Sequence, residues 1–191
     1  MVGKENVQRH EILITPLAAY GANQDSGQWI EATKNEDELK ERVTQVLREC
    51  PYSTTGSDWR ISDYQGFYGY GISLGEHPSL KDIAQAIELM ESHGELAVKL
   101  IDYFCGDVEE AVRHLNDKYL GVYDSPADYA EENVKSRISG EIPKEVAAYV
   151  DYVAMARDWL LGGEIFSIDI VDETNEDQTQ VHIFSNRPTS Q

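Results

Sequence analysis

Residues 142–169 have the sequence IPKEVAAYVDYVAMARDWLLGGEIFSID. Pro143 suits the first turn of one helix, Asp151 is a candidate N-cap for a second, and the glycine pair at 162–163 ends it. The β-rich run EIFSIDIV that follows, together with QTQVHIFS at 178–185, predicts two strands joined by the acidic loop DETNED. Helices followed by a hairpin predict a mixed α+β unit at this end of the chain.

The preceding segment, from Pro78 to Val134, predicts short amphipathic helices with tight links. Ser79 and Asp82 form a capping-box pattern, and Ser125 precedes a proline and stands three residues before Asp128. Asp107 and Glu110 open a further helix, and KYLGVY (118–123) is β-like. The residues expected to face inward are Ile83, Ala84, Ile87, Met90, Leu96, Ala97, Leu100, Ile101, Phe104 or Cys105, Ala111, Val112, Leu115, Tyr119, Ala127, Ala130 and Val134.

The amino-terminal part predicts a small sheet with one helix on a face. Three β-rich segments, EILITPLAAY (11–20), QWIEAT (28–33) and WRISDYQGFY (59–68), are expected to be strands. Between the second and third, Asn35 is expected to cap a helix ending at Glu49, with Glu38 in the reciprocal capping position. The buried stripe of that helix is expected to consist of Leu39, Val43, Val46 and Leu47.

Charge is the unusual property of this sequence. Its 191 residues include 35 acidic and 16 basic side chains, for a formal net charge of −19. The excess is −5 in residues 1–79, −9 in 80–160 and −5 in 161–191, so it is not confined to a tail. Direct binding to nucleic acid or to a membrane surface would favour the opposite sign. With no signal-peptide core and no run of about 18 apolar residues, a soluble cytoplasmic protein is expected.

No pattern for catalysis, metal binding or a cofactor is present. The five histidines are scattered without metal-ligand spacing, the two cysteines form no CxxC pair, and GFYGYG (66–71) lacks the glycine order of a phosphate-binding loop. Carboxylate pairs such as Glu109–Glu110 and Glu131–Glu132 are expected on solvated helix faces, where reactivity is low. We therefore expect a protein that is not an enzyme and needs no cofactor or metal.

The acidic residues recur at helical spacing. Glu88, Glu91 and Glu95, and then Asp128, Glu131 and Glu132, lie three, four or seven residues apart. Side chains at this spacing share a helix face with Cβ atoms about 5–6 Å apart, which is comparable to the separation of phosphates along a DNA strand. Two interpretations follow: a DNA mimic that binds a basic cleft, or an ordinary solvated surface such as salt-adapted proteins carry. Composition alone leaves both open.

Several ordered blocks resemble one known family. They are ILITPLAAYGANQDSGQWIEA, DWRISDYQGF, the helix at 79–91, YDSPADYAEENV, and IPKEVAAYVDYVAMARDWLLGGEIFSID, with Tyr149, Asp151, Tyr152, Ala156, Arg157 and Asp158 in step. Over nearly its whole length the chain resembles the ArdA antirestriction family. Gln65 stands where the family has an acidic residue, and the chain departs from the family in the loop 50–57 and after Ile170.

The resemblance implies an elongated homodimer whose carboxylates imitate bent DNA. Such a protein would block the DNA-binding groove in the methyltransferase core of type I restriction–modification enzymes and protect incoming mobile genetic elements. On this basis we expect an α+β protomer of three small domains, at residues 1–76, 77–106 and 107–191. The carboxylates expected to contact the enzyme are Glu88, Glu91, Glu95, Asp102, Glu109, Glu110, Asp117, Asp128, Glu131 and Glu132.

Two further expectations and two rival functions remain. Tyr119, Leu120, Val122 and Tyr123 are candidates for the dimer contact, because an edge strand can pair with its copy; an internal strand of the last domain is the alternative. The block 149–158 is expected mainly to lock helices together, with Arg157 pairing a neighbouring carboxylate. The rival functions are an acidic adaptor for another basic DNA-binding protein and a hydrolase that uses a carboxylate pair.

Overall fold

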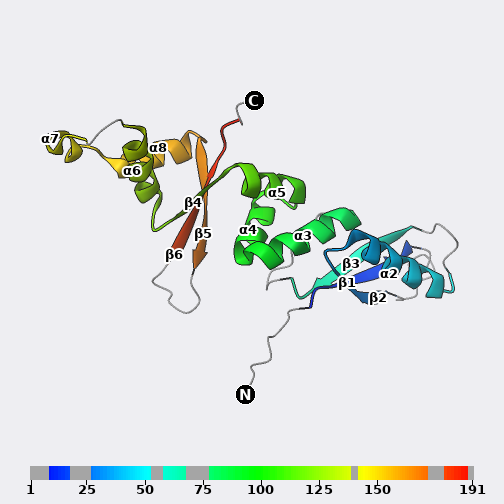
Figure 1. Cartoon of the computed structure of the whole chain (residues 1–191). Coiled ribbons are helices and arrows are strands. Elements are labelled where there is room, and N and C mark those ends of the chain that lie inside the picture. Colours follow the sequence, from blue (N-terminus) through cyan, green and yellow to red (C-terminus); the bar gives the residue numbers. More distant parts are fainter. Residues whose placement is uncertain are drawn as a thin grey trace, which may run out of the picture. The chain divides into compact units, whose positions relative to one another are not determined.

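The computed structural model describes residues 9–17, 27–52, 58–67, 78–138, 142–171 and 179–188. Their contacts divide the chain into two compact units, residues 1–111 and residues 112–191. Each unit combines helices with a three-stranded antiparallel sheet (Figure 1). The predicted α+β class is therefore confirmed, while the division into three domains stays a prediction.

The first sheet has the strand order β2-β1-β3. Its strands are β1 (Glu11–Pro16), β2 (Gln28–Glu31) and β3 (Trp59–Gln65). In the central strand, Ile12 and Ile14 point to the same face and are 0% exposed. Ile12 lies opposite Ile30 of β2, and Ile14 lies opposite Ile61 of β3, so buried β-branched side chains cross the sheet. All three predicted strands are present, but each ends before its predicted bound, at Pro16, Glu31 and Gln65; residues 18–20 and 68 lie outside the described residues.

Helix α2 (Glu36–Glu49) packs against β1 and β2. Asn35 caps it as predicted, because its side chain accepts hydrogen bonds from the amides of Asp37 and Glu38. The predicted stripe is buried at Leu39, Val43 and Val46, whereas Leu47 is half-buried.

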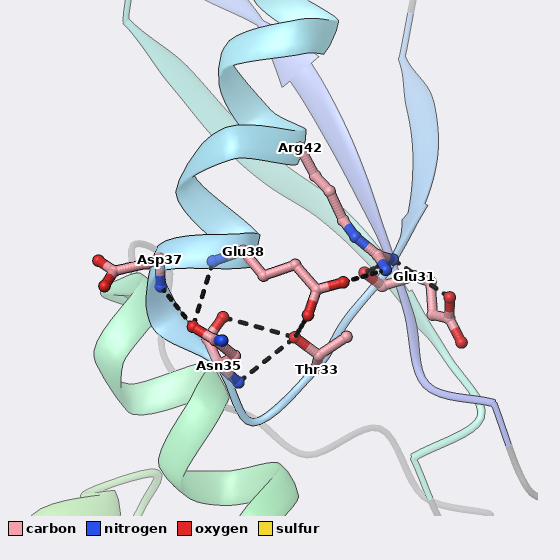
Figure 2. A network of polar contacts seen from close by, with 6 residues as sticks. All are labelled: Glu31, Thr33, Asn35, Asp37, Glu38 and Arg42. Carbon is pink, nitrogen blue, oxygen red and sulfur yellow. Dashed lines mark hydrogen bonds and ion pairs between the residues drawn. The ribbon is translucent and has the colours of Figure 1, made fainter.

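The capping box expected with Glu38 does not form. The Glu38 carboxylate instead accepts a hydrogen bond from the Thr33 hydroxyl at 3.3 Å and pairs with Arg42 at 2.6 Å (Figure 2). Arg42 also contacts the Glu31 carboxylate at 3.2 Å and donates to the Glu31 carbonyl at 2.7 Å. This network ties the end of β2 to the first turns of α2, and a nearby guanidinium outcompetes a backbone amide for the glutamate.

Three helices follow the first sheet: α3 (Leu80–His93), α4 (Glu95–Tyr103) and α5 (Val108–Asp117). The capping box predicted for α3 is present: the Ser79 hydroxyl accepts from the Asp82 amide, and the Asp82 carboxylate accepts from the Ser79 amide, both at 3.1 Å. The predicted inward-facing residues of α3 and α4 are buried at Ile83, Ala84, Ile87, Met90, Leu96, Ala97, Leu100 and Ile101.

Two predictions for these helices are wrong. Cys105 does not extend the apolar stripe of α4: it is exposed, and its φ of 54° lies in the left-handed region. The Gly106 amide donates to the Ile101 carbonyl at 2.9 Å, which closes the helix before Cys105. Tyr119 does not continue the face of α5, because that helix ends at Asp117 and Tyr119 begins a strand.

The second sheet has the strand order β4-β6-β5. Its strands are β4 (Tyr119–Tyr123), β5 (Ile165–Val171) and β6 (Thr179–Ser185). The central strand β6 buries Ile183 and Phe184 completely, and the Phe184 ring stacks on Phe166 with centroids 5.0 Å apart. The hairpin predicted from the sequence is confirmed as β5 and β6.

Helices α6 (Pro126–Arg137), α7 (Lys144–Ala147) and α8 (Tyr152–Leu161) belong to the second unit. The predicted caps are in place: Ser125 accepts from the Asp128 amide at 3.3 Å, and Asp151 accepts from the Ala154 amide at 2.9 Å. Helix α6 packs on α8 and on the sheet, where Tyr129 joins a buried cluster with Ile183. Among the described residues, no helix has both the length and the apolar character needed to cross a membrane.

Candidate functional site

Every carboxylate in the described part of the chain reaches the surface. The buried polar or charged residues there are His10, Thr15, His114 and Lys118, none of which is acidic. The cores of both units therefore contain no acid that needs an internal partner. The negative charge is free to face solvent or a binding partner.

All ten carboxylates predicted to contact a partner lie at the surface. Seven are exposed: Glu88, Glu91, Asp102, Glu109, Asp117, Asp128 and Glu132. Three are half-buried: Glu95, Glu110 and Glu131. Glu88 to Glu110 belong to the first unit and Asp117 to Glu132 to the second. Their exposure satisfies the first requirement for such contacts, and their role stays a prediction.

Three of the ten form ion pairs with a lysine. Glu91 pairs with Lys34 at 2.7 Å, and the other two pair with the lysine one turn later on the same helix, at 2.9 Å for Glu95 and 2.7 Å for Glu131. The hydrogen bond to Glu91 raises the pKa of Lys34 above its ordinary value. These pairs are solvated, so each contributes little to stability and can open when a partner approaches.

A second group has no ion pair within the described residues. Its members are Glu88, Asp102, Glu109, Asp117 and Glu132. We call these the unpaired acids. Their side chains are exposed, and they come from α3, α4, α5 and α6. Long-range attraction of a basic partner depends most on charges of this kind.

Helix α6 and the segment between α7 and α8 form an open acidic groove. Asp128 and Glu131 of α6 line it together with Asp151, the N-cap of α8. Tyr149 and Tyr152 line the same groove, and Tyr149 is 88% exposed. The fold thus brings two of the predicted carboxylates together with a third that sequence analysis did not select.

Several exposed acids fall outside the predicted set. On α2 they are Asp37, Glu41 and Glu49, and on or beside α8 they are Asp151 and Asp158. Helix α2 carries acids at the same helical spacing as the later helices. This spacing could have added the acids of α2 to the predicted set. Exposed acids therefore also occur on α2, whereas the acids predicted to contact the partner are those of α3 to α6.

The described residues offer little for catalysis. His10 and His114 are buried, and His182 accepts or donates a hydrogen bond with the Tyr119 hydroxyl at 2.8 Å. Burial lowers the pKa of His10 and of His182 below the ordinary value, which favours the neutral ring. Cys50 is buried and Cys105 is exposed, and both are free thiols. In this part of the chain, no group of three or more His, Cys, Asp or Glu side chains is placed to hold a metal ion.

The chain was compared with known protein families. Residues 12–170 match the profile of the family described as antirestriction protein (ArdA), from β1 to the penultimate residue of β5. The chain belongs to the ArdA family. ArdA proteins are antirestriction proteins and do not form a known enzyme family. The match ends at Ile170, where sequence analysis placed the departure from the ArdA pattern. No curated protein matches the chain in sequence.

The ArdA block at 149–158 combines structural and exposed residues. Asp151 caps α8 and Ala156 is 3% exposed, so these two positions serve the helix and its packing. Arg157 lies 3.5 Å from the Asp158 carboxylate, and both side chains are largely exposed. Tyr149 and Val153 are 88% and 70% exposed, so their side chains are not packed in the core of the described residues. The expected pairing of Arg157 with a neighbouring carboxylate is therefore present, and the expectation that this ArdA block mainly locks helices together stays a prediction.

Proposed function

We propose that the exposed carboxylates imitate DNA phosphates and block the DNA-binding groove in the methyltransferase core of a type I restriction–modification enzyme. The observation that carries this proposal is that no described carboxylate is buried, while helical spacing repeats exposed acids at Glu88 and Glu91 of α3 and at Asp128 and Glu132 of α6. Glu95, expected on the same face as Glu88 and Glu91, instead begins α4, because α3 ends at His93 and Gly94 turns the chain. A groove built for DNA is lined with Lys and Arg side chains that neutralise phosphates. In the complex, those Lys and Arg side chains would contact carboxylates in place of phosphates. Counterions would be released on binding, as they are when such a groove binds DNA.

The charge density of α6 supports the comparison with DNA. Asp128 and Glu132 are four residues apart, which is about 6 Å along a helix axis at about 1.5 Å per residue. With Glu131 this length carries three carboxylates, one of which is offset by Lys135. One strand of B-form DNA carries about two phosphates over about 6 Å of its axis. The first turns of α6 therefore present about the net charge of one DNA strand over the same length, while Lys135 and Arg137 in the last turn bring the net charge of the whole helix to −1.

The biological setting follows from this target. An inhibitor of restriction protects incoming mobile DNA, and it must act in the cytoplasm, where restriction enzymes meet that DNA. The proposal needs neither a cofactor nor direct contact with nucleic acid.

Titration of purified type I enzyme with this protein is expected to show stoichiometric inhibition. DNA cleavage should fall in proportion to the molar ratio and stop at a fixed ratio, because an occupied groove cannot admit DNA. Raising the salt concentration should weaken inhibition steeply, as it does for DNA binding. Inhibition that continues to grow with time at ratios far below one would contradict the proposal and favour hydrolysis by a carboxylate pair.

An acidic adaptor for another basic protein is the second candidate function. Assays against several DNA-binding enzymes distinguish it from inhibition of a type I enzyme. The same titration against several unrelated DNA-binding enzymes should leave most of them active. Strong inhibition of one of these enzymes, with the type I enzyme left active, would favour the adaptor. Both assays use the same protein preparation and the same measurement of DNA cleavage or binding.

We also propose that β4 pairs with its copy in a homodimer. The strand lies at an edge of the second sheet, and three of its side chains are exposed: Tyr119 at 38%, Leu120 at 37% and Val122 at 50%. Tyr123, also predicted for this contact, is half-buried against the Tyr129 ring. An exposed apolar edge strand is a template for pairing with another strand.

Val122→Glu is expected to weaken this dimer by about 100-fold, since a carboxylate would be buried in the contact. Sedimentation velocity over a range of protein concentrations measures the dissociation constant. Val171→Glu is the matched control, because Val171 is 45% exposed on β5, the opposite edge of the same sheet. A dimer that survives Val122→Glu as well as Val171→Glu would exclude β4 as the contact.

A further inference from the structure

A small pocket in the second unit has a composition unlike the acidic surface. It is formed by α6, α8 and the sheet, and its volume is about 130 Å³. Its lining includes Leu120, Tyr129, Arg137, Trp159, Ile165 and Arg187. Two guanidinium groups and two aromatic rings thus meet in one cavity.

The inner wall of the pocket is apolar and aromatic. Tyr129 is 8% exposed and Ile165 is 5% exposed. The Tyr129 and Trp159 rings meet edge to face, with centroids 5.9 Å apart. An engineered apolar cavity of about 150 Å³ binds benzene, so this pocket has the size to hold one six-membered ring.

The mouth of the pocket has a net positive charge. Arg187 pairs with Glu164, which also lines the pocket, whereas Arg137 forms no ion pair within the described residues. Both guanidinium groups lie near the Tyr129 hydroxyl: burial raises the pKa of Tyr129, and the charges of Arg137 and Arg187 oppose that rise. Among the described residues, one positive charge at the pocket therefore has no ion-pair partner.

The Tyr129 hydroxyl also has a proton to donate. It accepts a hydrogen bond from the Asn133 side-chain amide at 3.1 Å. Within the part of the chain that the structure describes, its own hydrogen has no acceptor. A group that enters the pocket could thus receive one hydrogen bond from Tyr129 and two from the guanidinium of Arg137.

We propose that this pocket binds a small aromatic carboxylate, with the ring against Tyr129 and Trp159 and the carboxylate on Arg137. One net positive charge matches one carboxylate. A doubly charged phosphate would meet the Glu164 carboxylate at the rim, which disfavours it. The flat walls favour an aromatic ring over a branched aliphatic group. This site is independent of DNA mimicry.

Benzoate is the probe, and the indole N–H signal of Trp159 in a ¹H–¹⁵N NMR spectrum is the readout. Trp159→Phe identifies that signal among the three tryptophans. Benzoate is expected to shift it in a saturable manner. Benzamide, which has the same shape without the charge, should bind at least about tenfold more weakly. Equal binding of the two, or shifts that never saturate, would overturn the proposal.

Arg137→Gln is expected to weaken benzoate binding at least about tenfold, because it removes the charged donor. Arg157→Gln is the matched control: Arg157 is exposed on α8, does not line the pocket, and its replacement changes the net charge equally. Both side chains are exposed, so folding should persist, which the rest of the spectrum checks. Equal affinity of the two variants would exclude Arg137 as the carboxylate partner.

Discussion

Replacing Glu88, Asp102, Glu109 and Glu132 together by lysine is expected to raise the Kd for the restriction enzyme by about 1,000-fold. Each of these unpaired acids is exposed, so none is needed inside the core. An exposed charge pair contributes about 0.5 kcal/mol, and reversal both removes an attraction and adds a repulsion, about 1 kcal/mol per site. Four sites give about 4 kcal/mol, which corresponds to about three powers of ten. Single reversals should change the Kd less than about tenfold.

The matched control reverses four exposed acids of the amino-terminal sheet and its helix, Glu41, Glu49, Asp58 and Asp63. Both variants change the net charge by the same amount, so the comparison separates arrangement from total charge. Binding is measured by competition with fluorescent DNA for the enzyme, and circular dichroism checks the fold. An equal loss of affinity in both variants would mean that net charge alone determines binding. No loss in the first variant would refute mimicry by the later helices.

Local signals predicted most of the fold. Asn35, Ser79, Ser125 and Asp151 each begin a helix where the sequence placed a cap, because a short polar side chain satisfies amides that the helix itself leaves open. The β-rich composition of the segments likewise located the strands. Errors arose where a competing contact decided the outcome.

The wrong prediction at Glu38 shows why such contacts cannot be predicted from the sequence. Its distance from Asn35 suits a capping box, but Arg42 lies one turn further along the same helix and Thr33 lies just before it. The stronger ionic contact wins. At Cys105 the bond from Gly106 to Ile101 ends the helix, and helix ends are set by such single bonds.

The candidate site was predicted only in part, since helical spacing reports exposure but not partners. All ten predicted carboxylates reach the surface, as amphipathic helices require. The sequence could not show that Lys34 pairs with Glu91, 57 residues later. Nor could it show that Asp151 joins Asp128 and Glu131 in one groove, because that meeting depends on how α6 packs on α8.

Phe184→Ala is expected to lower the free energy of unfolding of the second unit by about 3–5 kcal/mol. Phe184 is 0% exposed on β6, the strand that pairs with both β4 and β5. Its ring contacts Phe166 at 5.0 Å and Tyr119 at 5.1 Å between centroids. Removing it leaves a cavity at the centre of the sheet, and large-to-small changes of this kind cost about 3–5 kcal/mol. That is a large share of the roughly 5–15 kcal/mol typical of a folded domain.

Hydrogen exchange, measured for each peptide, shows which unit loses stability. Because each unit has its own buried residues, amides of β5 and β6 should lose protection in Phe184→Ala while those of α3 and α4 keep it. Leu100→Ala, at a residue of α4 that is also 0% exposed, should give the reverse pattern. If either variant deprotects both units equally, the chain unfolds as one cooperative body. The acids of α6 and those of α3 would then depend on the same core for their positions, and a defect in one unit would disable both charged surfaces.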